Sequence, residues 1–118
     1  MEKLKYKPIF ELIVLEEAAN FLKTLPYAVR EKISYNIDKV QAGFMDAELF
    51  KKLESSKIWE FRTLYQGKAY RLFAFWDTEE ETLVIATHGI VKKTQKTPSK
   101  EVDKTESIRK KYFENKKR

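Results

Sequence analysis

Residues 57–76, KIWEFRTLYQGKAYRLFAFW, contain two segments of alternating pattern separated by Gln66 and Gly67. A period of two is typical of strands with one buried face, and a short loop containing glycine is a hairpin signal. We therefore predict an antiparallel hairpin of residues 57–65 and 68–76. If Gln66 and Gly67 form the whole loop, paired residue numbers sum to 133, because loop length sets the register. Arg62 then lies directly opposite Arg71.

The two faces of this hairpin differ in chemistry. Alternation along the first strand places Trp59 and Phe61 on one face and Glu60 and Arg62 on the other. We expect the aromatic face to pack against helices and the arginine face to stay open. Like charges directly opposite each other destabilise a sheet. Either Glu60 offsets them as an ion-pair partner, or an anion binds between Arg62 and Arg71.

The segments before the hairpin predict one strand and two helices. Residues 6–15, YKPIFELIVL, read as a strand, and residues 16–25 repeat apolar side chains at helical spacing. Pro26 suits the first turn of a second helix, which ends near Gly43. Two amphipathic helices with almost no loop between them form a helical hairpin.

The segments after the hairpin predict a further strand and a last helix. Residues 82–90, TLVIATHGI, read as the strand, and residues 95–117 as the helix, with Thr97 as N-cap and Pro98 at the first position. The whole pattern predicts an α+β fold: an antiparallel sheet of about four strands, the helical hairpin on one face and a C-terminal helix. At 118 residues, we expect a single domain over residues 1–118.

Positive charge is concentrated in the last quarter of the chain. Residues 88–118 hold eleven Lys/Arg and four Asp/Glu, giving +7, and the remainder gives −1, which restores the net +6. Such asymmetry favours an anionic partner, although a basic tail can also be merely solvated. The absence of cysteine excludes disulfides and thiolate chemistry and fits a cytoplasmic protein. We expect no signal peptide and no membrane span, since charges interrupt the N-terminal segment.

The only histidine, His88, ends the last predicted strand beside Lys92, Lys93 and Lys96. An even-numbered loop through residues 77–81 would bring His88 to the face that carries Arg62 and Arg71. A strand-end histidine and a lysine-rich loop also occur without any function. Together with the arginine pair they suggest a site for a phosphate-rich ligand.

Three motifs resemble those of a known family. Residues 59–62 (WE-x-R), residues 70–71 (YR) and residues 88–98 (HG-x-x-KKTQKTP) are similar to the HigB-type, phage-derived HigB-like branch of the RelE/ParE toxin superfamily. The upstream residues 21–37, FLKTLPYAVREKISYNI, are similar to the helical hairpin of that family. The resemblance therefore covers most of the chain.

The resemblance implies the toxin of a type II toxin–antitoxin system. Such toxins are typically ribosome-dependent mRNA endonucleases that inhibit translation in the cytoplasm, so mRNA and the ribosome are the implied partners. The neutralising partner is a helix-turn-helix antitoxin of HigA type. Two other functions stay open: a ParE-like, gyrase-poisoning toxin on the same fold, and a non-catalytic RNA-binding module.

The implied chemistry needs no metal and no other cofactor. The ribose 2′-hydroxyl attacks the adjacent phosphate, leaving a 2′,3′-cyclic phosphate and a free 5′-hydroxyl, which requires a base, an acid and charge stabilisation. Within the resemblance we assign charge stabilisation to Arg62 and Arg71 and acid/base work to His88, whose reference pKa is about 6.5. We also assign Lys93 to catalysis, and we assign the binding of RNA phosphates to Lys92, Lys96 and Lys57. Glu60 orients Arg62 or serves as an alternative base.

Overall fold

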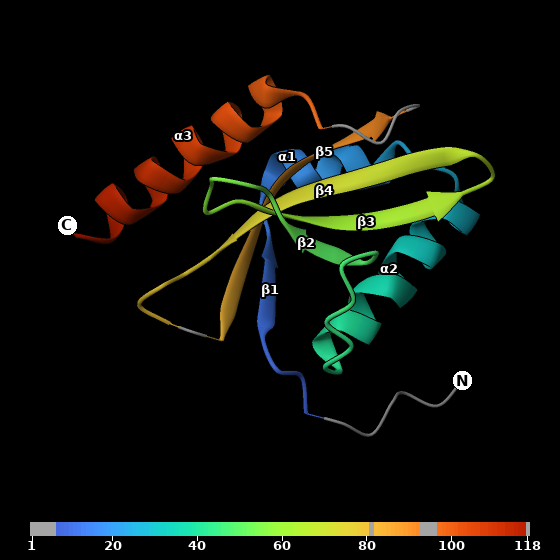
Figure 1. The fold of residues 1–118 in the computed structure, drawn as a ribbon, viewed down its shortest axis with the longest axis horizontal. Coiled ribbons are helices and arrows are strands. Elements are labelled where there is room, and N and C mark those ends of the chain that lie inside the picture. The colour runs from blue at the N-terminus through green and yellow to red at the C-terminus, as the bar shows by residue number, and fades with distance from the viewer. Residues whose placement is uncertain (1–6, 81, 93–96, 118) are drawn as a thin grey trace.

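The computed structural model describes residues 7–80, 82–92 and 97–117. They form an α+β fold with a five-stranded sheet in the order β1-β5-β4-β3-β2 and with helices on both faces (Figure 1). The elements in chain order are β1 (Glu11–Val14), α1 (Glu16–Lys23), α2 (Tyr27–Gln41), β2 (Phe50–Lys52), β3 (Trp59–Tyr65), β4 (Lys68–Trp76), β5 (Leu83–Lys92) and α3 (Ser99–Lys116).

The predicted hairpin and its register are confirmed. Tyr65 pairs with Lys68, and Arg62 pairs with Arg71. Gln66 and Gly67 have φ values of 48° and 78°. Both central residues therefore lie in the left-handed region, as a type I′ turn requires, and such a turn keeps the strand twist and the two-residue register.

The sheet departs from the prediction in strand number and direction. It has five strands, and β1 pairs with β5 in parallel, so the sheet is mixed where an antiparallel one was predicted. The unpredicted strand β2 is only three residues long and pairs Phe50 with Phe61. Three residues show no period, and the parallel pairing joins segments about seventy residues apart, so neither feature is visible in local pattern.

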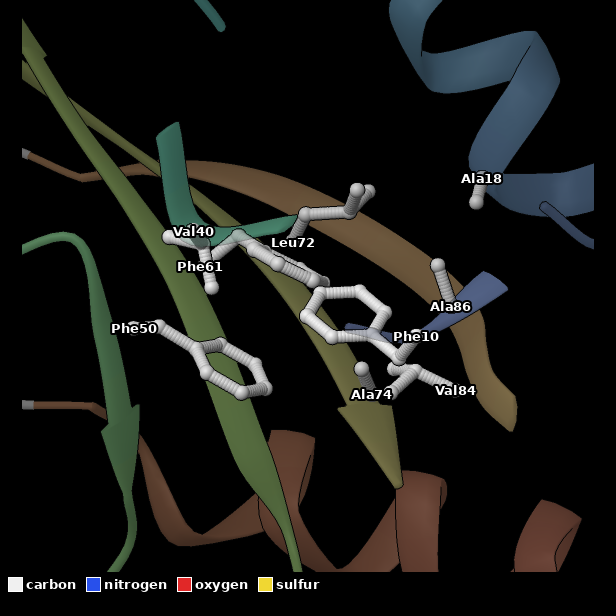
Figure 2. Close-up of a cluster of buried hydrophobic side chains, with 9 residues drawn as sticks. All are labelled: Phe10, Ala18, Val40, Phe50, Phe61, Leu72, Ala74, Val84 and Ala86. Atoms are coloured by element: carbon white, nitrogen blue, oxygen red, sulfur yellow. The ribbon is translucent and has the colours of Figure 1, made fainter. Parts of the chain in front are cut away.

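The helical hairpin covers one face of the sheet, as predicted. Helix α1 packs on β5 and α2 on β3. The core between these layers includes Phe10, Phe50, Phe61 and Leu72, and Figure 2 shows Ala18 of α1 turned toward the sheet. Pro26 occupies the N-cap position of α2 rather than its first helical position.

Helix α3 covers the part of the opposite face that carries Phe73 and Phe75, so the prediction of an open arginine face holds only in part. Its partly buried apolar side chains pack against a buried cluster of Ile58, Phe73, Phe75 and Ile85. Those α3 side chains are Val102, Ile108, Tyr112 and Phe113. Thr97 is not the N-cap of α3, because Pro98 holds that position and no side chain caps the helix.

A β-bulge in β5 decides which way His88 faces. Ala74 pairs with Ala86, whereas Phe73 pairs with His88, so Thr87 is an extra residue. Trp76 pairs with Val84, and this register without the bulge would place His88 opposite Leu72, on the other face of the sheet. The bulge, and not an even-numbered loop, brings His88 to the arginine face. Because the bulge reverses the alternation, His88 still shares the face of Phe73 and Arg71.

The glycine after His88 faces the other way, toward α1. A Cβ atom on Gly89 would lie 2.3 Å from a ring carbon of Phe21. Only a residue without a side chain allows α1 to approach the sheet this closely. The His88–Gly89 pair therefore packs against a different helix on each face of the sheet.

Candidate functional site

The arginine pair closes on one buried carboxylate. Nε of Arg71 lies 3.3 Å and Nε of Arg62 lies 3.5 Å from Oε1 of Glu60. The side chains of Glu60 and Arg71 are 2% and 3% exposed, and that of Arg62 is 18% exposed. Glu60 is thus the ion-pair partner that one of the two sequence alternatives required.

The other oxygen of Glu60 is held from the end of β5 and the start of α3. The hydroxyl of Thr97 donates a hydrogen bond to Oε2 of Glu60 at 2.9 Å. Nζ of Lys92 donates to Oγ1 of Thr97 at 3.5 Å, and Lys92 is itself buried. Three cationic side chains therefore gather around Glu60, from three neighbouring strands.

Burial and mutual repulsion lower the pKa values of Arg71 and Lys92. Burial lowers the pKa of Arg71, Glu60 opposes this, and Arg62 lowers it further. Burial likewise lowers the pKa of Lys92, as do Arg71 and Arg62, while Glu60 raises it. An anion placed beside the cluster would relieve this repulsion.

A hollow of about 300 Å³ adjoins the pair. Its lining residues are Glu48, Arg62, Leu64, Ala69 and Arg71. Leu64 is 66% exposed, so solvent reaches the hollow. The arrangement presents two guanidinium groups, an apolar surface and one carboxylate to whatever occupies it.

Sequence reasoning missed Glu48, which lies between α2 and β2 where no periodic pattern exists. Arg62 fixes this segment, because its Nη1 donates to the carbonyl oxygen of Ala47 at 3.1 Å. Its backbone N–H donates to the carbonyl oxygen of Leu49 at 2.8 Å. The same arginine that lines the hollow therefore positions Glu48 beside it.

His88 lies on the arginine face but under α3. It is 2% exposed, with Nε2 3.1 Å from Oε1 of Glu101 and Nδ1 2.9 Å from Oγ1 of Thr87. Burial lowers the pKa of His88, while its hydrogen bond to Glu101 raises it. Because a carboxylate only accepts, neutral His88 carries its proton on Nε2 and accepts at Nδ1 from Thr87. His88 is not among the residues that line the hollow.

One other residue singled out from the sequence, Lys57, lies apart from the arginine pair. Lys57 lines a second hollow, together with Trp59 and Trp76. The hydroxyl of Tyr112 donates to Oδ2 of the buried Asp77 at 2.7 Å and so fastens α3. Lys93 and Lys96 lie outside the described residues.

The described ranges show neither a cluster of metal ligands nor a helix able to span a membrane. In residues 7–80, 82–92 and 97–117, no three or more His, Cys, Asp or Glu side chains are grouped as metal ligands would be. Among the same residues, no helix combines the length and hydropathy that crossing a membrane demands.

Comparison with known proteins gives one family and a fold. The profile of the family described as "Phage derived protein Gp49-like (DUF891)" matches residues 20–110. No curated protein matches the chain. The structure is similar to the free state of an E. coli toxin RelE mutant with two arginines replaced by alanine. The TM-score is 0.60 at 20% identity, over 86% of this chain and 97% of that one.

A second solved structure is similar to a smaller extent. It is the archaeal RelE–RelB complex from Pyrococcus horikoshii OT3, with a TM-score of 0.51 and 14% identity over 69% of this chain and 92% of that chain. At such identities both likenesses concern the fold alone.

Proposed function

The chain belongs to the Phage derived protein Gp49-like family, and from this premise we propose that it is the toxin of a type II toxin–antitoxin pair. Its proposed activity is ribosome-dependent endonucleolytic cleavage of messenger RNA, as in HigB-type toxins. The observation that carries the activity is the opposed pair of Arg62 and Arg71 lining a solvent-reached hollow.

The fold likeness supports the toxin class and a protein partner. One similar structure is named a toxin, and the other is a complex of RelE with RelB. We propose that this chain too is neutralised by a small antitoxin, of the helix-turn-helix, HigA-like type. The excess of basic residues from His88 onward suits the further proposed partners, the ribosome and mRNA, in the cytoplasm.

In the proposed reaction, RNA places one phosphate in the hollow between the arginines. The 2′ oxygen attacks phosphorus, the bond from phosphorus to the 5′ oxygen breaks, and a 2′,3′-cyclic phosphate and a 5′-hydroxyl result. Arg62 and Arg71 stabilise the charge that develops on the phosphoryl oxygens. Lys92, which bonds to Thr97 beside Glu60, adds to the positive potential at the hollow. Lys93 and Lys96 are proposed to bind the flanking phosphates.

The proton of the 2′-hydroxyl passes to Glu48 in this proposal. Glu48 lines the hollow together with both arginines, whereas neither Glu60 nor His88 is among its lining residues. A base must come within hydrogen-bond reach of the proton it takes, so access favours Glu48 over the two residues chosen from sequence. Water that enters at the exposed Leu64 protonates the leaving 5′ oxygen.

The test is to express the protein in a translating extract and to map new RNA ends. We expect cuts within translated messages that carry 5′-hydroxyl and 2′,3′-cyclic phosphate termini. Arg71→Lys keeps the charge but loses the planar fork, and we expect cleavage to fall about 10²-fold, in the range found for lost charge-stabilising donors. The matched control is Arg30→Lys on the exposed surface of α2.

Two outcomes would contradict the proposal. One is inhibition with intact messages and with signs of DNA damage, which points to a gyrase poison. The other is full cleavage by Arg71→Lys, which removes the arginine pair from the mechanism while leaving the activity.

A further inference from the structure

A second hollow, of about 180 Å³, lies where β3 begins and β4 ends. Its lining residues are Lys52, Lys57, Trp59, Trp76, Thr78 and Arg109. They come from β2, from the segment between β2 and β3, from the start of β3 and the end of β4, from the loop after β4 and from α3. None of the proposed chemistry uses this hollow.

Both tryptophans of the chain line it. Their rings are 6.4 Å apart, with planes at 77°. Trp59 stacks on Phe50 at 4.6 Å with planes 25° apart, and Phe50 is buried in the core. The two rings are thereby held as rigid walls, while each keeps part of its surface accessible.

Cations surround these aromatic walls. Lys52 and Lys57 are exposed, and within the described ranges neither has a carboxylate as an ion-pair partner. Arg109 is held by Glu106 at 2.9 Å. Flat aromatic surfaces beside unpaired ammonium groups match a ligand that carries a π-face and a negative charge together.

We propose that this hollow binds one nucleotide of single-stranded RNA, with the base against the tryptophans and the phosphates on Lys52 and Lys57. Base stacking on aromatic side chains within a basic groove is the usual chemistry of sequence-tolerant RNA binding. The choice of RNA rests on the proposed function.

The hollow is separate from the arginine pair. Trp59 and Arg62 are three residues apart on β3, so their side chains point to opposite faces of the sheet. Both tryptophans pack against the core cluster that the helical hairpin covers, while Arg109 reaches the hollow from α3. A nucleotide in this hollow would therefore be a second contact with the RNA, apart from the cleaved bond.

Intrinsic fluorescence tests this directly, because the chain has no tryptophan elsewhere. The probe is a 2′-O-methyl hexaadenylate, which has no free 2′-hydroxyl and is not cleaved. We expect saturable quenching, and a hexamer of abasic nucleotides with the same phosphates should not quench. Trp76→Leu keeps Trp59 as reporter and should weaken binding on the order of tenfold, as lost base stacking does.

The lysines are tested by a pair of charge-matched double variants. Lys52→Gln with Lys57→Gln should weaken binding and reduce the salt slope by about 1.4, in line with two lost phosphate contacts to a single strand. Lys51→Gln with Lys32→Gln removes the same charge from exposed positions outside the hollow and should leave both quantities nearly unchanged.

The outcomes separate this inference from the proposed function. The inference is overturned if the hexaadenylate does not quench, or if the abasic hexamer quenches equally. It is also overturned if only hexaglutamate causes a response, which would favour an acidic protein partner. Cleavage of messages without quenching would refute the inference and leave the function standing. Quenching that depends on Lys52 and Lys57, in a protein that cuts no message, would retain the binding site and refute the nuclease.

Discussion

Arg62 faces Arg71 across the β3–β4 ladder, and both side chains approach the same oxygen of Glu60. The opposition follows from the two-residue turn, because any odd change in loop length would move one arginine to the other face. A buried carboxylate between two opposed cations makes the cluster a structural unit, and we propose that the same two arginines bind an anion in the adjoining hollow.

Replacing Glu60 by glutamine should destabilise the fold. The amide can still accept from Thr97, but the negative charge between Arg62 and Arg71 is lost. We expect the free energy of unfolding to fall by about 3 kcal/mol, as when one partner of a buried ion pair is removed. Urea denaturation measures this, with the exposed Glu54→Gln as control, and an effect equal to the control would contradict the ion-pair role.

Replacing Glu48 by glutamine should impair catalysis and leave stability unchanged. The side chain is exposed and lines the hollow beside Arg62 and Arg71. Loss of a general base typically costs about 10²–10⁴-fold, which single-turnover cleavage of ribosome-bound message would measure. His88→Gln and Glu60→Gln should retain more activity than Glu48→Gln when compared below their unfolding transitions. A fully active Glu48→Gln would return the base to His88 or Glu60.

Stability should depend on pH through His88, the only histidine. Burial lowers the pKa of His88, and the neighbouring Lys104 lowers it as well, while Glu101 and Glu17 raise it. The unfolded chain, with a histidine pKa of about 6.5, therefore binds a proton more readily than the folded one. Neutral His88 makes its full contribution to the free energy of unfolding above about pH 6.5. This contribution is lost as pH falls toward the lower pKa of His88 in the folded state.

Urea midpoints between pH 7.5 and 5 would measure this effect. The urea midpoint of the wild type should fall as pH falls. The midpoint of His88→Gln should be lower at pH 7.5 and should change less with pH. Parallel profiles for the two proteins would contradict the assignment, because the titrating group would then lie elsewhere.

The buried Asp77 should anchor the C-terminal part of α3. Burial alone would raise the pKa of Asp77, but hydrogen bonds from Lys116, Tyr112 and the backbone N–H groups of Glu79 and Glu80 outweigh it and lower the pKa to about 2. Burial and the bond to Asp77 together raise the pKa of Tyr112 to about 12. The stabilisation is present above pH 4 and is lost as pH falls toward 2, since folded Asp77 resists protonation.

Asp77→Asn should therefore cost about 2 kcal/mol of unfolding free energy at pH 7, from the size of that pKa shift. Amide hydrogen exchange should accelerate in α3 more than in β4 or β5. The exposed Asp103→Asn on the same helix is the control. Uniform acceleration over the whole sheet would show that Asp77 supports the fold generally and does not anchor α3.

The hairpin shows how far local pattern reaches. Loop residues and a period of two are properties of neighbours in the chain, so β3, β4 and the pairing of Arg62 with Arg71 could be predicted. The bounds of α1 and α2 follow closely for the same reason. The bulge at Thr87 could not be predicted, because an extra residue in β5 leaves no trace in apolar spacing.

The candidate site shows the opposite limit. Glu48 reaches the hollow because Arg62 holds its segment, and Thr97 reaches Glu60 because α3 begins there. His88 was assigned a role from its chemistry as a titratable group, but its burial depends on where α3 lies.

The sequence by itself determined the helical hairpin, the β3–β4 turn and the opposed arginines, since each depends on interactions within a few residues or across a two-residue loop. Only the tertiary structure decided the parallel pairing of β1 with β5, the packing of α3 on part of the arginine face and the placing of Glu48 in the same hollow as Arg71. These features depend on which apolar surfaces, distant in sequence, are buried against each other, and many arrangements satisfy the same local pattern.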